Sequence, residues 1–130
     1  MGTDAEDISV LMVEDDASDA RRLEGLLAEC DLACSVESFE LLWQGLERLK
    51  AGGIDIILLD LPEPEVGAMD PVERIREIAP GVPIVVLGTY ESTAFVYASA
   101  ITGAVAWLEK DELSADGLAQ TIRSAVQQAH

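Results

Sequence analysis

The sequence predicts an α/β fold: a doubly wound, five-stranded parallel sheet with helices on both faces. Five short apolar runs alternate with helical patterns along the whole chain, without a linker between them. Residues 8–13, 54–59 and 82–87 are apolar almost throughout, as strands buried on both faces are. Because a crossover between parallel strands needs a helix, the alternation favours a parallel sheet. The 130 residues fit one domain, residues 8–130, after a tail of residues 1–7.

Three helices are predicted in the first two thirds of the chain. The first starts near Ser18 after a turn of acidic residues, and a weak strand at residues 33–36 follows it. Asp70 and Pro71 are the N-cap and the first residue of the third helix. The inward-facing residues are Leu23, Leu26, Leu27 and Cys30 in the first helix, Leu42, Leu46 and Leu49 in the second, and Val72, Ile75 and Ile78 in the third.

The last third of the chain continues the same alternation. A fourth helix is expected over about residues 91–101, and a short strand over residues 105–108. Ser114 caps a fifth helix. Helix-ending signals are Gly52-Gly53, Pro80-Gly81 and Gly103. The inward stripe of the fifth helix is Leu118, Ile122, Ala125, Val126 and Ala129.

The charge of the chain excludes two classes of partner. There are 25 acidic and 8 basic residues, and the net charge is −17. A protein that binds a nucleic acid backbone or an anionic membrane surface needs a face rich in lysine or arginine, so we expect neither partner. Because 49% of the residues are hydrophobic, the chain can form a core, which excludes disorder. The acidic residues must lie on the surface or in a site that requires them.

Neither a membrane span nor an export signal is recognisable. The N-terminus carries acidic residues and no basic one, unlike a signal peptide. The uncharged stretch of residues 92–108 is interrupted by Thr, Ser and Gly, which indicates buried or partner-facing structure. Cys30 and Cys34 form one pair without a His nearby, and we expect two buried, reduced thiols in a cytoplasmic protein.

Charged residues follow three of the predicted strands, at the edge where the carboxyl ends of parallel strands meet. Residues 14–16 (Glu-Asp-Asp) follow the first strand, Asp60 the third and Lys110 the fifth, while Gly88 and Thr89 follow the fourth. Clustered carboxylates call for a cation, and Mg²⁺ prefers hard oxygen ligands. A carboxylate beside Mg²⁺ can attack a phosphoryl group and form an aspartyl phosphate, whose oxygens a lysine would contact.

Each acidic residue taken alone has a simpler interpretation. Turns favour aspartate, and Asp15 or Asp16 could serve only to cap the helix that starts near Ser18. That interpretation does not explain Asp60, which ends an apolar run with no helix start after it. It also leaves the lysine at the same edge unexplained.

Six segments of the chain resemble the response-regulator receiver domains of two-component signalling. They occur in the order and at the separations of that family, and they cover nearly the whole chain. The resemblance implies a (βα)5, flavodoxin-like fold with strand order 2-1-3-4-5. The segments are Val10-Leu-Met-Val-Glu-Asp15, Ile56-Ile-Leu-Leu-Asp60-Leu, Pro64, Pro83-Ile-Val-Val-Leu87, Gly103-Ala104 and Trp107-Leu108-Glu109-Lys110.

The resemblance also implies a role for each residue at the strand ends. Asp60 would accept a phosphoryl group from a histidine kinase or a phosphotransfer protein. Asp15 would bind Mg²⁺ directly and Glu14 mainly through water, while Asp60 and the backbone carbonyl of Pro62 would complete the protein ligands. Asp16 is the alternative member of the acidic pair.

The chain departs from the family at several positions. Gly88 stands where a Ser or Thr usually donates a hydrogen bond to the phosphoryl group, and Thr89 comes one residue later. Pro62 stiffens the loop after the acceptor, and Asp111 replaces a proline that commonly forms a cis bond. Trp107 occupies the position of the aromatic switch residue, or is a half-buried aromatic side chain at the edge of the sheet.

The helix expected around residues 91–101 has no charge after Glu91, although a helix covering one side of a sheet usually has a polar outer face. Two interpretations remain open for the 91–108 region. It forms an apolar patch for a homodimer or an output domain, or its many small residues form a modest neutral surface.

Three functions compete. The first is a phosphorylatable receiver, which catalyses only its own phosphoryl transfer and dephosphorylation. The second is a degenerate receiver that acts as a phosphorylation-independent interaction or dimerisation module, which Gly88 favours. The third is a Mg²⁺-dependent phosphohydrolase, which is disfavoured because Pro62 occupies the place of its usual second aspartate.

Overall fold

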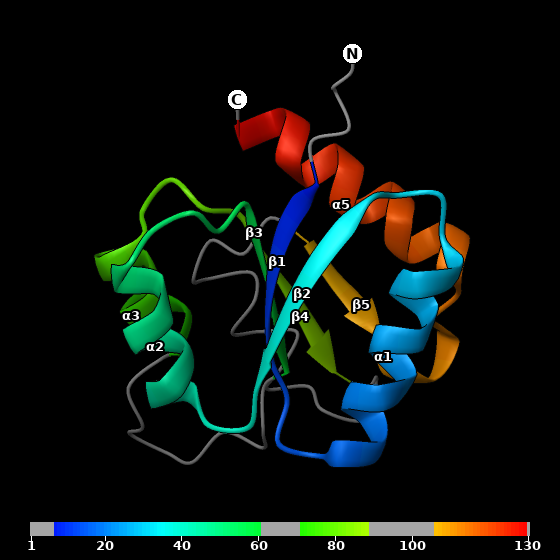
Figure 1. Cartoon of the computed structure of the whole chain (residues 1–130), viewed down its shortest axis with the longest axis horizontal. Coiled ribbons are helices and arrows are strands. Elements are labelled where there is room, and N and C mark those ends of the chain that lie inside the picture. Colours follow the sequence, from blue (N-terminus) through cyan, green and yellow to red (C-terminus); the bar gives the residue numbers. More distant parts are fainter. Residues whose placement is uncertain (1–6, 61–70, 89–105, 130) are drawn as a thin grey trace.

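Five parallel strands in the order β2-β1-β3-β4-β5 form the centre of the computed structural model, which describes residues 7–60, 71–88 and 106–129 (Figure 1). This topology confirms the predicted fold class. The strands are β1 (Ile8–Val13), β2 (Cys34–Phe39), β3 (Ile56–Asp60), β4 (Ile84–Gly88) and β5 (Ala106–Glu109). The helices are α1 (Ala17–Glu29), α2 (Leu42–Lys50), α3 (Pro71–Ile78), the short 3-10 helix η1 (Lys110–Glu112) and α5 (Ala115–Ala129).

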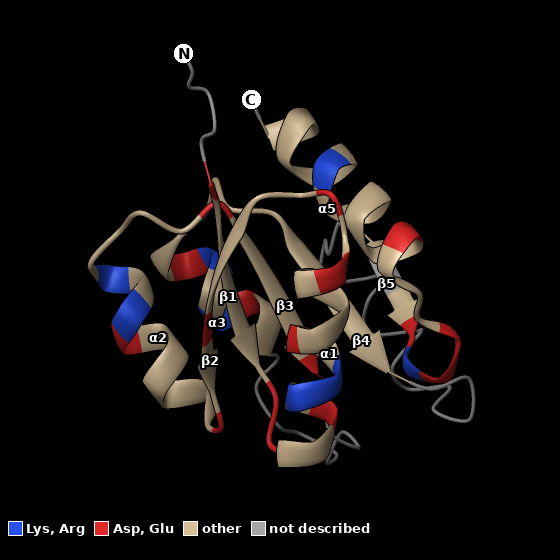
Figure 2. Cartoon of the chain, turned by 45° about the vertical axis from the view of Figure 1, so that its right-hand side comes forward, with Lys and Arg blue, Asp and Glu red and all other residues tan. Residues whose placement is uncertain are grey.

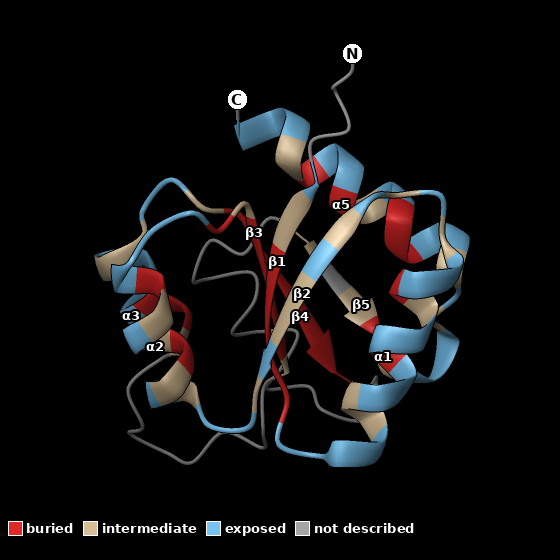
Figure 3. Cartoon of the chain, in the orientation of Figure 1, coloured by how far each residue is buried: buried red, intermediate tan, exposed pale blue. Residues whose placement is uncertain are grey.

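Two apolar clusters, one on each face of the sheet, hold the helices in place. Successive residues of a strand point to opposite faces, so Leu58 packs toward α1 and α5 while Leu59 packs toward α2 and α3. Figure 3 shows the buried residues in β1, β3 and β4 and on the inner sides of the helices. The prediction that β1, β3 and β4 are buried on both faces is therefore confirmed.

The strand register brings the carboxyl ends of β1, β3 and β4 to one edge. Val13 of β1 pairs with Leu59 of β3, so the residues that follow them are neighbours. Asp60 is the last paired residue of β3 and lies opposite Leu87, and Gly88 pairs with Glu109 of β5. Residues 14, 60 and 110 consequently meet at this edge, although they are far apart in the sequence.

Four strands have bounds that differ from the expected ones. The fourth covers residues 84–88 rather than 82–87, and the fifth ends at residue 109 rather than 108. The second strand covers residues 34–39 rather than 33–36, since it pairs with β1 along its full length. The third begins at Ile56 rather than residue 54. Asp55 has a local role instead: its carboxylate accepts a hydrogen bond from the Ser9 amide at 2.8 Å.

The predicted ends of several helices are confirmed. Gly52 and Gly53 have φ values of 80° and 84°, a conformation that suits glycine, directly after α2. The Ser114 hydroxyl accepts a hydrogen bond from the Gly117 amide at 3.1 Å and caps α5. Pro71 is the first residue of α3. Asp70 and the helix expected over residues 91–101 lie outside the described residues.

The inward stripe of α5 was predicted with one error at its end. Leu118, Ile122 and Ala125 are buried, but Ala129 is exposed, and Ala119 is buried in its place. The last turn of α5 lies at the edge where the strands begin, beyond the part of the sheet that the helix covers (Figure 1). Periodicity alone does not indicate where the supporting sheet ends.

Cys30 and Cys34 are both free thiols, as expected, but they are half-buried rather than buried. Cys30 is the C-cap residue of α1, and Cys34 is the first residue of the edge strand β2. Burial raises the pKa of the Cys34 thiol to about 11, so this thiol is protonated at neutral pH. Among the described residues, no helix is long and apolar enough to cross a membrane.

Candidate functional site

Glu14 is a buried carboxylate at the end of β1. Its amide donates a hydrogen bond to the carbonyl of Phe39, which continues the pairing with β2 one residue beyond β1. Its side chain has no exposed surface. One carboxylate oxygen accepts a hydrogen bond from the amide of Asp16, and the other accepts one from Lys110. A buried acidic side chain in an otherwise apolar strand end requires such partners.

Three carboxylates come together at this edge. One oxygen from each of Glu14, Asp15 and Asp60 lies within 4.8 Å of the other two. Glu14 is buried, Asp60 is half-buried and Asp15 is exposed, so the cluster extends from the interior to the surface. Carboxylate oxygens are hard ligands of the kind that Mg²⁺ prefers. This ion binds one or two carboxylates directly and keeps several waters, through which a further carboxylate can contact it. The residues present therefore fit the expected metal.

Lys110 connects the acidic cluster to the end of β5. Its ammonium donates hydrogen bonds to Glu14 Oε1 at 2.9 Å and to Asp60 Oδ1 at 3.1 Å. It also forms an ion pair with Asp19 Oδ2 at 2.7 Å. Figure 2 shows acidic ribbon after β1 and the turn of mixed charge after β5. The geometry thus brings together Glu14, Asp60 and Lys110, three residues that the sequence selected.

Burial and ion pairing shift the pKa values of two groups in this cluster, Glu14 and Lys110. Burial raises the pKa of Glu14 to about 7, and the hydrogen bond from Lys110 offsets only part of that effect. The neighbouring Asp60 raises it further. Burial alone would lower the pKa of Lys110, but its contacts with Asp19, Glu14 and Asp60 raise it above the ordinary value. Lys110 is therefore cationic, and the site carries excess negative charge.

Asp16 serves as a helix cap. It is the N-cap residue of α1, and its Oδ1 accepts a hydrogen bond from the Asp19 amide at 2.9 Å. The simpler interpretation is thus confirmed for Asp16. The carboxylate cluster consists of Glu14 and Asp15 with Asp60, and Asp16 is not a member of it.

The turn after β5 contains a feature that the sequence did not indicate. Glu109 accepts a hydrogen bond from the Asp111 amide through its carboxylate at 3.1 Å, and this contact caps the 3-10 helix η1. The described peptide bonds, including the one before Asp111, are trans. Lys110 is therefore the first residue of a capped 3-10 helix, and Asp111, at the position expected for a proline, is the second.

The ion pair between Asp19 and Lys110 was also missed. Asp19 lies in the first turn of α1, and the sequence pattern did not single it out. A signal was available, because an acidic residue in the first turn after a strand end faces the same edge as the residues of that strand end.

The structure describes only some of the residues that were expected to respond to phosphorylation. Gly88 is buried at the end of β4 and offers no side chain. Trp107 lies in β5, where its backbone pairs with Val86. Pro62, Thr89 and the 91–105 segment lie outside the described residues, as does the side chain of Trp107.

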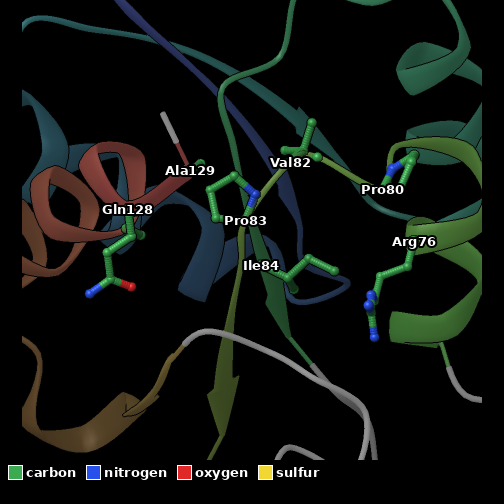
Figure 4. A pocket seen from close by; sticks show the side chains of 9 residues that line it. Arg76, Pro80, Val82, Pro83, Ile84, Gln128 and Ala129 are labelled. Atoms are coloured by element: carbon green, nitrogen blue, oxygen red, sulfur yellow. The ribbon is translucent and has the colours of Figure 1, made fainter.

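Two hollows lie at opposite edges of the sheet. The one at the edge where the strands begin has a volume of about 270 Å³, and Arg76 is its one charged lining residue among the described residues (Figure 4). Figure 4 shows it bordered by Pro83 and Ile84 at the start of β4 and by Gln128 of α5. The other, of about 200 Å³, is lined by Asp15 and Asp60. The hollow that is lined by acidic side chains is therefore the one at the carboxyl edge of the sheet.

The hollow beside Asp60 is mostly apolar. Its lining includes the apolar residues Val13, Leu41, Leu42 and Leu59, together with the acidic residues Asp15, Glu40 and Asp60. Leu41 and, two residues later, Trp43 are 47% and 61% exposed. Apolar side chains at the start of α2 therefore line the same hollow as the Asp60 carboxylate.

The chain matches one protein family over most of its length. The family model of the response regulator receiver domain matches residues 10–123. The transcriptional regulatory protein ZraR of Escherichia coli K12 is 26% identical over 125 residues, which cover 96% of this chain. The chain spans 28% of the length of that relative.

Solved structures show the same fold. A CheY-like response regulator receiver domain protein from Methanospirillum hungatei JF-1 has a TM-score of 0.79 at 20% identity, with 95% of this chain and 97% of that chain covered. The beryllofluoride-activated NtrC4 receiver domain dimer has a TM-score of 0.77 at 22% identity, with 94% and 98% covered.

Proposed function

Because the chain belongs to the response regulator receiver domain family, we propose that it is a phosphoacceptor of two-component signalling. In this proposal, Asp60 takes a phosphoryl group from a histidine kinase or a phosphotransfer protein and thereby changes protein–protein contacts. The observation that carries the proposal is the contact of one ammonium, that of Lys110, with both Asp60 and Glu14. This lysine neutralises charge at the point where a phosphoryl group would arrive.

The proposed reaction is a nucleophilic displacement at phosphorus. A carboxylate oxygen of Asp60 forms the new O–P bond while the P–N bond of the donor phosphohistidine breaks. The electron pair of that bond stays on the imidazole nitrogen. Lys110 remains protonated and follows the phosphoryl oxygens. Hydrolysis of the aspartyl phosphate by water would complete the cycle, so the chain would act on no other substrate.

Mg²⁺ would be held by the carboxylate cluster. We assign Asp15 and Asp60 as direct ligands and Glu14 as a ligand mainly through water, and the backbone carbonyl of Pro62 would complete the set. When bound, the ion would neutralise negative charge on the phosphoryl oxygens. The grouping of the carboxylates supports this assignment, since one oxygen from each of Glu14, Asp15 and Asp60 lies within 4.8 Å of the other two.

The partners follow from the family. We propose that a histidine kinase supplies the phosphoryl group and that the protein acts in the cytoplasm. ZraR is a transcriptional regulatory protein of which this chain spans 28%, so we propose that the receiver acts on an output domain or on a second copy of itself. The region of residues 91–108 is our candidate for that contact.

The direct test is incubation with Mg²⁺ and acetyl phosphate, followed by intact mass measurement. We expect an adduct of about 80 Da that is lost in Asp60→Asn. Asp31→Asn, which removes an exposed carboxylate from the turn after α1, is the matched control and should keep the adduct. No adduct in the unmodified protein would contradict the proposal.

One observation favours a second function. Gly88 removes the hydroxyl that the family uses at the end of the fourth strand, so a phosphorylation-independent interaction module is the alternative. That alternative predicts no adduct and no Mg²⁺ binding by isothermal titration calorimetry. Sedimentation velocity at several concentrations, with and without beryllofluoride, then tests self-association, and a monomer in every condition would exclude a dimer.

A further inference from the structure

We propose that Asp19 competes with the phosphoryl group for Lys110 and so restrains phosphorylation of Asp60. This inference rests on the proposed receiver function. It concerns an acidic residue that neither the carboxylate cluster nor the family's site residues include.

Acidic side chains already surround the Lys110 ammonium in this structure: Glu14 and Asp60 accept hydrogen bonds from it, and Asp19 forms an ion pair with it. An ammonium carries three N–H donors. Three carboxylate oxygens surround the Lys110 nitrogen, from Asp19 at 2.7 Å, Glu14 at 2.9 Å and Asp60 at 3.1 Å. A phosphoryl oxygen that binds Lys110 must therefore displace one of these contacts.

Exposure indicates which contact is displaced. The Glu14 side chain has no exposed surface, so losing its cation would leave a buried charge unpaired. Asp60 carries the phosphoryl group itself. The Asp19 side chain is 36% exposed and regains water when Lys110 leaves it. Asp19 is thus the partner that gives way.

Among the described residues, the polar contact of the Asp19 side chain is the ion pair with Lys110. The N-terminus of α1 is capped by the Asp16 carboxylate, which uses the backbone amide of residue 19 and not its side chain. Among the three contacts of the ammonium, that with Asp19 is the shortest and contributes most to the raised pKa of Lys110. The ion pair therefore acts on the lysine and can be removed without removing the helix cap.

As a consequence, Asp60 would be phosphorylated less readily than it would be in the same site without Asp19. Removing the charge of Asp19 should remove its competition for the Lys110 ammonium and so strengthen the bond between that ammonium and the phosphoryl oxygens. The contacts with Glu14 and Asp60 would keep the lysine in place.

The test uses beryllofluoride, a phosphoryl analogue, with saturating Mg²⁺ and isothermal titration calorimetry on the full chain. We expect Asp19→Asn and Asp19→Ser to bind beryllofluoride about three- to fivefold more tightly than the unmodified protein. Glu24→Gln, which removes an exposed charge from the same helix, should bind as the unmodified protein does. Thermal unfolding of each variant checks that the domain is intact.

A double-mutant cycle separates competition from a merely structural effect. In a Lys110→Gln background, most of the gain from Asp19→Asn should disappear, because there is no ammonium left to release. Unchanged or weaker binding by both Asp19 variants, beside clear binding by the unmodified protein, would overturn the inference and leave the receiver function standing. If the unmodified protein bound no beryllofluoride, the receiver function would fail, and this inference with it.

Discussion

The ammonium of Lys110 lies 2.9 Å from a carboxylate oxygen of Glu14, and the two residues are 96 positions apart in the chain. Glu14 follows β1 and Lys110 follows β5, so this contact spans the carboxyl edge of the sheet across β3 and β4. It is a buried contact, since 14% of the lysine side chain and none of the glutamate side chain is exposed. The candidate site and the stability of the sheet edge therefore depend on the same pair.

Lys110→Ala should destabilise the domain, because it leaves the charge of Glu14 buried without its cation. We expect the free energy of unfolding at pH 8 to fall by about 3 kcal/mol, measured by urea denaturation. The control is Lys50→Ala, which removes a lysine from an exposed ion pair with Glu47 and should cost less than about 1 kcal/mol. Equal losses in the two variants would contradict this prediction.

The stability of the metal-free protein should depend on pH through Glu14. Its pKa is about 7 in the folded state against an ordinary value of 4.5, so the folded state binds this proton more tightly than the unfolded state does. The resulting stability is fully present below pH 4.5 and is lost as the pH rises to about 7. Urea denaturation of the unmodified protein and of Glu14→Gln in EDTA measures this, and parallel stability curves would refute it.

Mg²⁺ should raise the stability of the folded protein at pH 8, where the Glu14 carboxyl is ionised. At ten times the dissociation constant, a ligand that binds only the folded state contributes about 1.4 kcal/mol. Thermal unfolding with and without Mg²⁺ should show an upward shift that Asp15→Asn reduces and Asp31→Asn leaves intact. A shift of the same size in Asp15→Asn would exclude that residue as a ligand.

Two helical glycines should respond in opposite ways to substitution by alanine. A Cβ at Gly25 of α1 meets nothing within 4 Å, so Gly25→Ala should stabilise the domain by about 0.5–1 kcal/mol through helix propensity. A Cβ at Gly45 of α2 would lie 3.0 Å from Val13 Cγ2. Gly45→Ala should therefore be at least about 1 kcal/mol less favourable than Gly25→Ala, by urea denaturation. Equal effects would contradict this prediction and would show that α2 can shift away from Val13 at little cost.

Most of the fold was predictable because strand burial and helix periodicity are local signals. The apolar run ending at Asp60 predicts a central strand, and the register of β3 confirms where that carboxylate lies. The boundaries of β2 were not predictable in the same way. Its residues are half-buried or exposed without a regular alternation, and it pairs with β1 along its full length.

The candidate site was predictable as a set of strand ends, since parallel strands bring their carboxyl ends together. Two contacts were not predicted, because each depends on how far a side chain extends from its helix or strand. Asp19 contacts Lys110 from the first turn of α1, and Glu109 caps the turn that carries that lysine. Both contacts cross between elements whose spacing is fixed only in the folded molecule.

The contact between Glu14 and Lys110 also has a consequence for the order of assembly. Lys110 is contributed by the segment after the last strand, so a nascent chain that has released only its first four strands contains every acidic residue of the cluster but no ammonium beside Asp60. The complete site then exists only once the whole sheet is assembled. A molecule able to hold a phosphoryl group in this way is one that has finished folding.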